Sequence, residues 1–245
     1  MVKHTKTAIV TGSSKGIGAA IATRLSQEGF NVVVNFSGDA APADALVSQI
    51  QQAGGSALSA RADVSDPAAV AKLWDVAEAT FGGVDVLVNN AGIMKLASIA
   101  DSADALFDSQ IRINLKGTFN LLREAATRLR EGGRIINLSS SVVGLYAPSY
   151  GAYAATKAGV EALTHVLTKE LRGRNITVNA IAPGPTATAL FLDGKPQAVI
   201  DNYSKAAPLE RLGTPQDIAA AVAFLAGPDG SWINGQVLRA NGGII

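Results

Sequence analysis

The chain has 245 residues, of which 48% are hydrophobic and 17% charged, with a formal net charge of +1. This composition is too apolar for a disordered chain and supports a large core. The small net charge offers no general attraction for nucleic acid or anionic lipid. Without cysteine, the chain has no disulfide, thiol catalyst or Cys-based zinc site. Since only His4 and His165 carry imidazoles, we also expect no metal site.

The length suits one domain spanning residues 1–245, because no Pro/Gly/Ser linker is long enough to divide it. There is no run of about 18 apolar residues that would cross a bilayer. The N-terminal residues lead directly into an apolar strand and lack the hydrophobic region of a signal peptide. We therefore expect a cytoplasmic protein that does not enter a membrane.

Short apolar segments alternate with longer helical stretches along the whole chain. The helices are expected at residues 16–28, 42–53, from 66 onward, 103–130, 152–171 and 215–225. Seven strands are expected, at residues 8–10, 31–35, 56–61, 84–88, 133–138, 176–181 and 236–239. Strands that are apolar on both faces and separated by helices predict a doubly wound parallel α/β sheet of the Rossmann type. The one irregular stretch, at about residues 183–208, is long enough to suggest a functional loop.

Glycines at positions 12, 16 and 18 follow the first strand with the spacing Thr-Gly-x-x-x-Gly-x-Gly. Glycines there let the backbone approach a diphosphate, which the N-terminus of the following helix stabilises. Taken alone, the motif favours a diphosphate site but also occurs in ordinary strand–helix turns that need glycine. Other polar residues follow later strands, and the carboxyl ends of parallel strands form the ligand edge of such a sheet. These residues lie at 89–92, 139–141 and 183–184. In addition, Asn114 lies inside a long helix, and Tyr153 and Lys157 stand four residues apart on one face of another helix.

At these residues the sequence resembles the short-chain dehydrogenase/reductase family, and the resemblance extends over essentially the whole chain. It implies that Tyr153 protonates a carbonyl oxygen as hydride reaches the carbon, and that Lys157 favours the phenolate and binds the nicotinamide ribose. It also implies that Ser140 hydrogen-bonds the substrate oxygen and that Asn114 holds a water for proton relay. The family usually places the serine thirteen residues before the tyrosine, which selects Ser140 from three adjacent serines.

The end of the second strand indicates the choice of cofactor. NAD enzymes tend to place an acid there, but the chain has Asn35 and Ser37 and no acid before Asp39. Ser14, Asn35 and Ser37 are expected to be neutral donors for a 2′-phosphate. Lys15 provides a cation near the adenosine ribose, which the family resemblance associates with NADP(H). The resemblance implies further contacts with adenine, the diphosphate and the nicotinamide. The full set of expected cofactor residues is Gly12, Ser14, Lys15, Ile17, Gly18, Asn35, Ser37, Asp63, Val64, Asn90, Ala91, Gly92, Tyr153, Lys157, Pro183, Gly184, Thr186 and Thr188.

By the same resemblance, the segment at about residues 186–208 is a substrate lid. Its apolar residues alternate with charges, which suggests an amphipathic lid over a mainly apolar pocket. Phe191 is expected on the lid side, with Val142, Leu145 and Tyr146 on the opposite wall. The implied substrate is a small-molecule ketone or aldehyde.

Two alternatives remain open at this point. One is a 3-oxoacyl-carrier-protein reductase, a subgroup that docks its carrier protein through two arginines. Arg174 matches the first of them. Glu131 stands at the position of the second, and Arg130 is adjacent to it. The small net charge adds no steering toward an acidic carrier protein, so free carbonyl compounds are favoured. The other alternative is a sugar or alcohol dehydrogenase. The resemblance also implies a homotetramer built on the two long helices.

Overall fold

The computed structural model describes residues 5–245, so His4 lies outside the described residues. Within them, seven parallel strands form one sheet in the order β3-β2-β1-β4-β5-β6-β7. This confirms the expected doubly wound fold. The strands are β1 (Thr7–Val10), β2 (Asn31–Phe36), β3 (Ser56–Arg61), β4 (Val86–Asn89), β5 (Arg134–Leu138), β6 (Thr177–Pro183) and β7 (Val237–Ala240).

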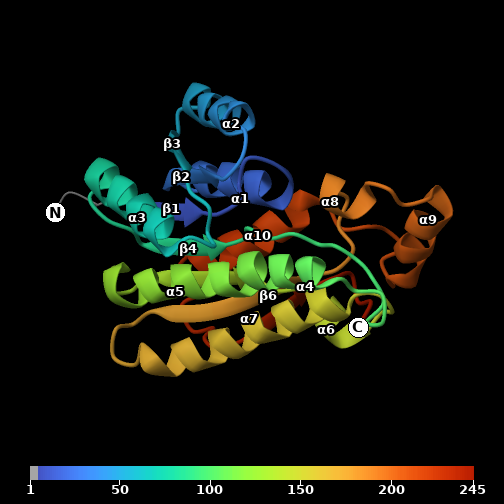
Figure 1. Ribbon diagram of the computed structural model, residues 1–245. Helices are drawn as coiled ribbons and strands as arrows, with labels where there is room; N and C mark the ends of the chain where they lie inside the picture. The colour runs from blue at the N-terminus through green and yellow to red at the C-terminus, as the bar shows by residue number, and fades with distance from the viewer. Residues whose placement is uncertain (1–4) are drawn as a thin grey trace.

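Helices cover both faces of the sheet (Figure 1). One face packs against α1 (Gly16–Gln27), α2 (Ala41–Gln52) and α10 (Pro215–Ala226). The other packs against α3 (Pro67–Phe81), α5 (Gly117–Arg128) and α7 (Gly151–Glu170). No helix among residues 5–245 is long and apolar enough to cross a membrane.

The apolar strands follow directly from this two-faced packing. Successive side chains of a strand point to opposite faces, and in β1 the side chains of Ala8 and Val10 lie in one core cluster and that of Ile9 in the other. All three are fully buried. A strand with both faces covered must be apolar at every position, which is why these segments show no polar alternation.

The order of the strands fixes the place of a ligand crevice. From β1 the chain runs outward to β2 and β3 and then returns to β4, which pairs with the opposite edge of β1. At such a switch point the loops after neighbouring strands diverge and leave a crevice at their carboxyl ends. The segments after β1 and β4 therefore face each other across it.

The long helix expected over residues 103–130 is divided in the structure. It consists of α4 (Asp104–Gln110), a π-helical segment (Ile111–Lys116) and α5. Asn114 lies fully buried within the π-helical segment, where its carbonyl accepts a hydrogen bond of 2.8 Å from the Thr118 hydroxyl. A π-helical turn takes up one extra residue without changing the apolar pattern enough to be recognised, so the expectation of a continuous α-helix was wrong.

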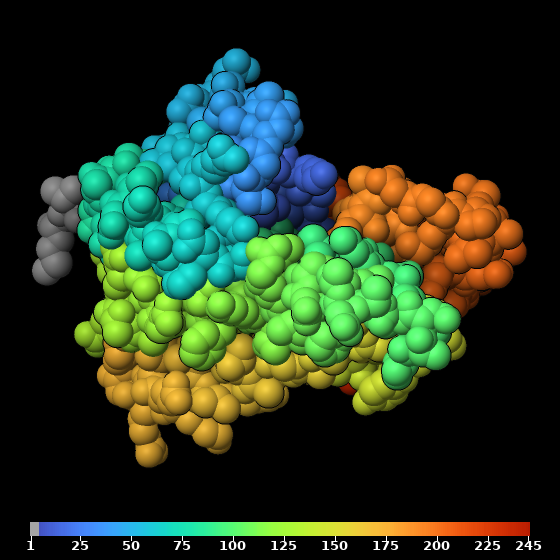
Figure 2. Space-filling model, in the orientation of Figure 1, coloured from blue at the N-terminus to red at the C-terminus, as the bar shows by residue number. Residues whose placement is uncertain are grey.

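The stretch expected to be irregular also contains regular structure. β6 continues to Pro183, and two helices follow, α8 (Ala189–Leu192) and α9 (Gln197–Ala206). In Figures 1 and 2 they form an orange lobe at one side of the molecule. The mixed charge of α9 obscured it in the sequence, because neither α8 nor α9 has a buried residue to reveal a helical period.

Candidate active site

The glycine-rich turn between β1 and α1 is held by positions that only glycine occupies easily. Gly12 and Gly16 both adopt φ +59°, a conformation that costs other residues free energy. A Cβ on Gly18 would lie 2.5 Å from the Asn90 amide nitrogen and from the Gly12 carbonyl oxygen. The N-cap residue of α1, Lys15, makes no side-chain cap. The first-turn N–H groups therefore stay available for an anion.

A cleft of about 530 Å³ extends from this turn to the ends of β2 and β4. Asn90 ties its two sides together, because its amide donates to the carbonyls of Thr11 and Gly12 at 2.9 and 3.0 Å. A long, narrow cleft across the switch point, with a helix N-terminus at its centre, fits a dinucleotide. The predicted residues that line it are Gly12, Ser14, Lys15, Ile17, Gly18, Asn35, Ser37, Asp63, Val64, Asn90, Ala91, Gly92 and Thr188.

Asn35 differs from the expectation, because its amide is already engaged inside the protein. Its Oδ1 accepts from the Gly12 N–H at 3.2 Å, and its Nδ2 donates to the carbonyls of Ala60 and Ala62 at 3.2 and 3.1 Å. The side chain is 1% exposed. It therefore has no free donor for a 2′-phosphate, and the prediction that it provides one was wrong.

The other groups at the same end of the cleft are two cations, a neutral hydroxyl and one carboxylate. Lys15 and Ser37 are exposed there. Arg61, at the end of β3, donates its Nε to the Ser37 carbonyl at 3.3 Å and brings a second cation that sequence reasoning missed. Asp39 points one carboxylate oxygen at the N–H of Ala41, 3.1 Å away, near the start of α2. This end of the cleft thus favours an anionic group.

Asp63 lies after β3 on the opposite wall of the cleft. Burial alone would raise its pKa, but hydrogen bonds from the Ser65 backbone and hydroxyl and the nearby Arg112 guanidinium lower the pKa below its usual value. The carboxylate is therefore ionised and fixed in place. It can accept a hydrogen bond from a ligand without a change in its charge.

A second, smaller cavity of about 150 Å³ adjoins the cleft, and Ile17, Asn90, Gly92 and Thr188 line both. The Thr188 side chain lies next to the glycine-rich turn, 3.7 Å from where a Cβ on Gly16 would be. The cavity therefore opens where one end of a dinucleotide would lie. The other predicted residues on its wall are Ser140, Val142, Tyr153, Lys157, Pro183, Gly184, Thr186 and Phe191.

Tyr153 and Lys157 lie one turn apart on α7, with Ser140 opposite them. Burial raises the pKa of Tyr153 to about 12, and a hydrogen bond from the Ser140 hydroxyl acts in the other direction. Burial lowers the pKa of Lys157 to about 8. Lys157 Nζ donates to the Leu138 carbonyl at 2.6 Å and lies 5.7 Å from the centre of the Tyr153 ring.

Burial of the phenol places the pKa of Tyr153 above its ordinary value, whereas a nearby ammonium acts in the opposite direction. Tyr153 is therefore protonated at neutral pH. That is the form in which a phenol can act as an acid. The expected effect of Lys157 on the phenolate stays a prediction.

Asn114 lines neither the cleft nor the smaller cavity, and its side chain binds the loop that follows β4. Its Oδ1 accepts from the Ile93 N–H and its Nδ2 donates to the Ile93 carbonyl, both at 2.8 Å. Nδ2 also donates to the Thr156 hydroxyl at 3.3 Å. The side chain thus fixes the loop beside Gly92, and only one lone pair of Oδ1 remains for a water.

Of the residues predicted for the substrate wall, Val142 and Leu145 line this cavity and Tyr146 does not. Tyr146 is 79% exposed and absent from the cavity wall. It caps the short helix α6 (Val142–Leu145) in the left-handed conformation, φ +49°, which turns its side chain toward solvent. Leu145, Ala147 and Tyr150 line this wall. Tyr150 was overlooked, although its position three residues before Tyr153 placed it on the same side of the helix.

The two arginines considered for docking a carrier protein are held by the chain itself. Arg174 donates to the carbonyls of Ala126 and Leu129. Arg130 forms an ion pair of 3.1 Å with Asp85. Arg174 lies in the turn before β6 and Arg130 in the turn before β5, so both lie at the edge of the sheet opposite Tyr153.

Comparisons with known proteins show what the chain is similar to. A sequence profile for the family described as enoyl-(acyl carrier protein) reductase matches residues 12–245. A short-chain type dehydrogenase/reductase of Picea abies is 45% identical, covering 97% of this chain and 92% of its own. An NADPH-dependent aldehyde reductase-like chloroplastic protein of Arabidopsis thaliana is 42% identical, covering 98% and 94%. The crystal structure of a Burkholderia cenocepacia short chain dehydrogenase in complex with NADP has a TM-score of 0.92 and 37% identity, covering 98% and 97%.

Proposed function

Because the chain belongs to the short-chain dehydrogenase/reductase family, we propose that it is an NADPH-dependent reductase of ketones or aldehydes. One observation carries this proposal: Tyr153, Ser140 and Lys157 meet on the wall of a largely apolar cavity that opens from a dinucleotide-sized cleft. The cavity admits an uncharged carbonyl compound. The three side chains supply the hydrogen bonds and the proton that its oxygen needs.

NADP(H) fits the larger cleft. The glycine-rich turn and the free N-terminus of α1 bind its diphosphate. Lys15, Ser14 and Ser37 bind the 2′-phosphate, with Arg61 nearby. An Arabidopsis relative bears the name of an NADPH-dependent reductase, and a Burkholderia relative was solved with NADP. When bound, the reduced cofactor supplies the hydride. Pro183, Gly184 and Thr186 hold the nicotinamide end, because they line the smaller cavity.

The chain's own residues position the substrate oxygen and donate a proton to it. Ser140 hydrogen-bonds the substrate oxygen and orients it toward Tyr153, and Tyr153 gives that oxygen its phenolic proton. The positive charge of Lys157 then stabilises the phenolate, whose formation burial opposes. Asn114 holds the Ile93 loop, and so the Gly92 side of the cavity, in position.

The substrate is a free carbonyl compound. The cavity is small and largely apolar, and Arg130 and Arg174 have their guanidinium groups occupied within the chain. A carrier protein is acidic and needs exposed cations to dock. These two arginines do not provide them.

The first test follows the absorbance of NADPH and, separately, NADH with an aryl ketone, a β-keto ester, an aldehyde and an acetoacetyl thioester. We expect oxidation of NADPH in preference to NADH. In Tyr153→Phe, turnover should fall about 10²- to 10⁴-fold while thermal unfolding is unchanged. A variant that retained most of its turnover would contradict the role given to Tyr153.

We further propose that the protein is a homotetramer. Apolar side chains remain exposed on the two long helical segments, among them Phe107, Phe119 and Val166, and Trp232 near the C-terminus is 97% exposed. Large exposed apolar surfaces of this kind are typical of subunit contacts. Light scattering measures the mass directly, and Phe119→Lys is expected to shift it toward smaller species.

A further inference from the structure

Two tyrosines outside the catalytic group, Tyr150 and Tyr203, also line the smaller cavity. Tyr150 is the N-cap residue of α7, and Tyr203 belongs to α9. The two hydroxyls interact, and Tyr203 contributes, after burial, to raising the pKa of Tyr150. The Tyr150 ring lies edge-on to Tyr153 at 6.5 Å, and that of Phe191 edge-on to Tyr203 at 5.4 Å. A series of aromatic rings therefore runs from the catalytic tyrosine to the α8–α9 segment.

Most other polar side chains on the cavity wall already have partners within the chain. Ser139 donates to Glu161 at 2.6 Å, and Ser141 donates to the Ala182 carbonyl at 3.0 Å. The amide of Asn90 and the hydroxyls of Thr186 and Thr188 also donate to backbone carbonyls.

Beyond the catalytic residues, the tyrosine pair is thus the polar group left for a ligand. Both tyrosines line the cavity, their hydroxyls interact with each other, and neither donates to a backbone carbonyl or a carboxylate among residues 5–245. Inside a largely apolar cavity, a donor without an acceptor selects for a ligand that supplies one.

We propose that the Tyr150–Tyr203 pair binds a second oxygen of the substrate, so that the site takes aromatic ketones or aldehydes with another carbonyl or hydroxyl next to the reacting carbonyl. This inference rests on the proposed function. The aromatic rings of Tyr150, Phe191 and Tyr203 suit the aryl group. Because Tyr203 lies on α9, the same hydrogen bond also holds the α8–α9 segment over the bound substrate.

The test compares 1-phenyl-1,2-propanedione, which carries the second oxygen, with propiophenone, which lacks it. The variants are Tyr203→Phe and Tyr150→Phe, which keep the rings and remove one hydroxyl each. Phe191→Leu is the control, because it removes a ring and no hydroxyl. For each substrate, kcat/KM of the variant is divided by that of the wild type, which cancels the different intrinsic reactivities of the two ketones.

Tyr203→Phe is expected to lower kcat/KM for the dione about tenfold and to leave that for propiophenone within about twofold. Phe191→Leu should affect both ketones equally. Equal losses for both ketones in Tyr203→Phe would overturn the proposal and leave the pair a simple latch between α7 and α9. No loss for either ketone would overturn it as well.

Failure of the proposed function would look different, because wild-type protein would then bind NADPH and reduce neither ketone. In that case the quenching of NADPH fluorescence measures ketone binding without turnover. Tighter binding of the dione that is lost in Tyr203→Phe would still support the tyrosine pair. Equal binding of the two ketones by wild-type protein would overturn it.

Discussion

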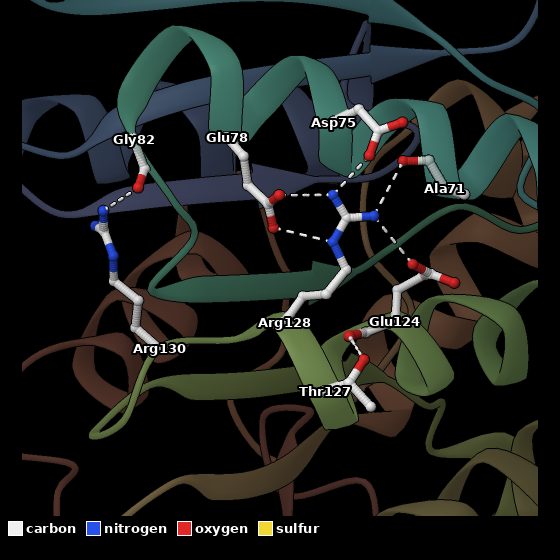
Figure 3. A network of polar contacts seen from close by, with 8 residues as sticks. All are labelled: Ala71, Asp75, Glu78, Gly82, Glu124, Thr127, Arg128 and Arg130. Atoms are coloured by element: carbon white, nitrogen blue, oxygen red, sulfur yellow. Dashed lines mark hydrogen bonds and ion pairs between the residues drawn. The ribbon is translucent and has the colours of Figure 1, made fainter.

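Two cationic side chains of this protein, Arg128 and Lys157, lie in contrasting surroundings. Arg128 of α5 reaches Asp75 and Glu78 of α3, both at 2.7 Å, and Glu124 of its own helix at 3.1 Å (Figure 3). Hydrogen bonds to Glu78, with smaller contributions from Asp75 and Glu124, outweigh burial and raise the pKa of Arg128 further above its ordinary value. The guanidinium is permanently charged and surrounded by opposite charge.

Lys157 has no such partners. Its ammonium donates to the Leu138 carbonyl, and no carboxylate within residues 5–245 lies within ion-pair distance of it. Burial therefore lowers its pKa to about 8. The positive charge of Arg128 is neutralised by carboxylates and joins two helices. The positive charge of Lys157 has no carboxylate partner and can respond to a negative charge that develops beside it.

Removal of Lys157 should have the largest effect on activity. In Lys157→Met we expect kcat/KM for carbonyl reduction to fall about 10²- to 10⁴-fold, because the Tyr153 phenolate loses its nearby positive charge. Steady-state kinetics with NADPH measures this. Arg128→Met serves as the control and should keep most of its activity in the folded fraction.

The same variant should be more stable than the wild type at pH 7. The pKa of Lys157 is about 8 when folded and near its ordinary 10.5 when unfolded, so the unfolded chain binds more protons between these values. Wild-type stability therefore rises from pH 8 to 10.5, and below pH 8 the buried ammonium costs at most about 3 kcal/mol. Urea unfolding at pH 7 and pH 10.5 tests this, and a Lys157→Met variant less stable at pH 7 would contradict it.

Arg128→Met should show the opposite pattern, with stability lost and chemistry preserved. It leaves Asp75, Glu78 and Glu124 together without their cation and removes the contact with the Trp74 ring at 5.8 Å. We expect a loss of about 2 kcal/mol, between the values for buried and exposed pairs. Arg24→Met breaks the exposed pair with Glu28 and should cost about 0.5 kcal/mol.

The pH dependence of kcat/KM should be set by Lys157 and not by Arg128. Because the pKa of Lys157 is about 8, its positive charge is lost as the pH rises through that value. We expect kcat/KM for carbonyl reduction to fall about tenfold per pH unit above pH 8. The profile of Arg128→Met should match that of the wild type, and a flat profile up to pH 10 would argue against this role for Lys157.

The smallest effect is expected at Lys15, an exposed cation that forms no ion pair among residues 5–245. Lys15→Ala should reduce the preference for NADPH over NADH about fivefold, since an exposed cation contributes roughly 1 kcal/mol to binding a phosphate. The ratio of kcat/KM for the two cofactors measures this. Lys72→Ala, on the exposed side of α3, is the matched control and should leave the ratio unchanged.

Much of the fold and the location of the site follow from local sequence. Strands covered on both faces show as apolar runs such as residues 31–35, and the end of each parallel strand defines one edge of the sheet. Thus the positions of Tyr153, Lys157 and Ser140 on one cavity could be expected from their places after β5 and on α7. The glycine-rich turn likewise revealed the cleft.

The errors arise where contacts distant in sequence decide the outcome. Asn35 reads as a polar residue at a strand end, but carbonyls of the neighbouring β3 segment claim its amide. The left-handed backbone of Tyr146 and the π-helical turn around Asn114 leave no mark on hydrophobic spacing. The approach of Tyr150 to Tyr203 depends on where α9 lies relative to α7.

The buried amide of Asn35 also constrains how the nucleotide preference of such a chain could be redesigned. An aspartate at this position would resemble the acid of an NAD enzyme and could still accept from the Gly12 N–H, but it would lose the donor that the carbonyls of Ala60 and Ala62 require. Ser37, which is exposed on the same cleft, has no such duty. Support of the nucleotide loop and discrimination of the ribose are therefore assigned to separate residues, and only the second can be exchanged without remaking the first.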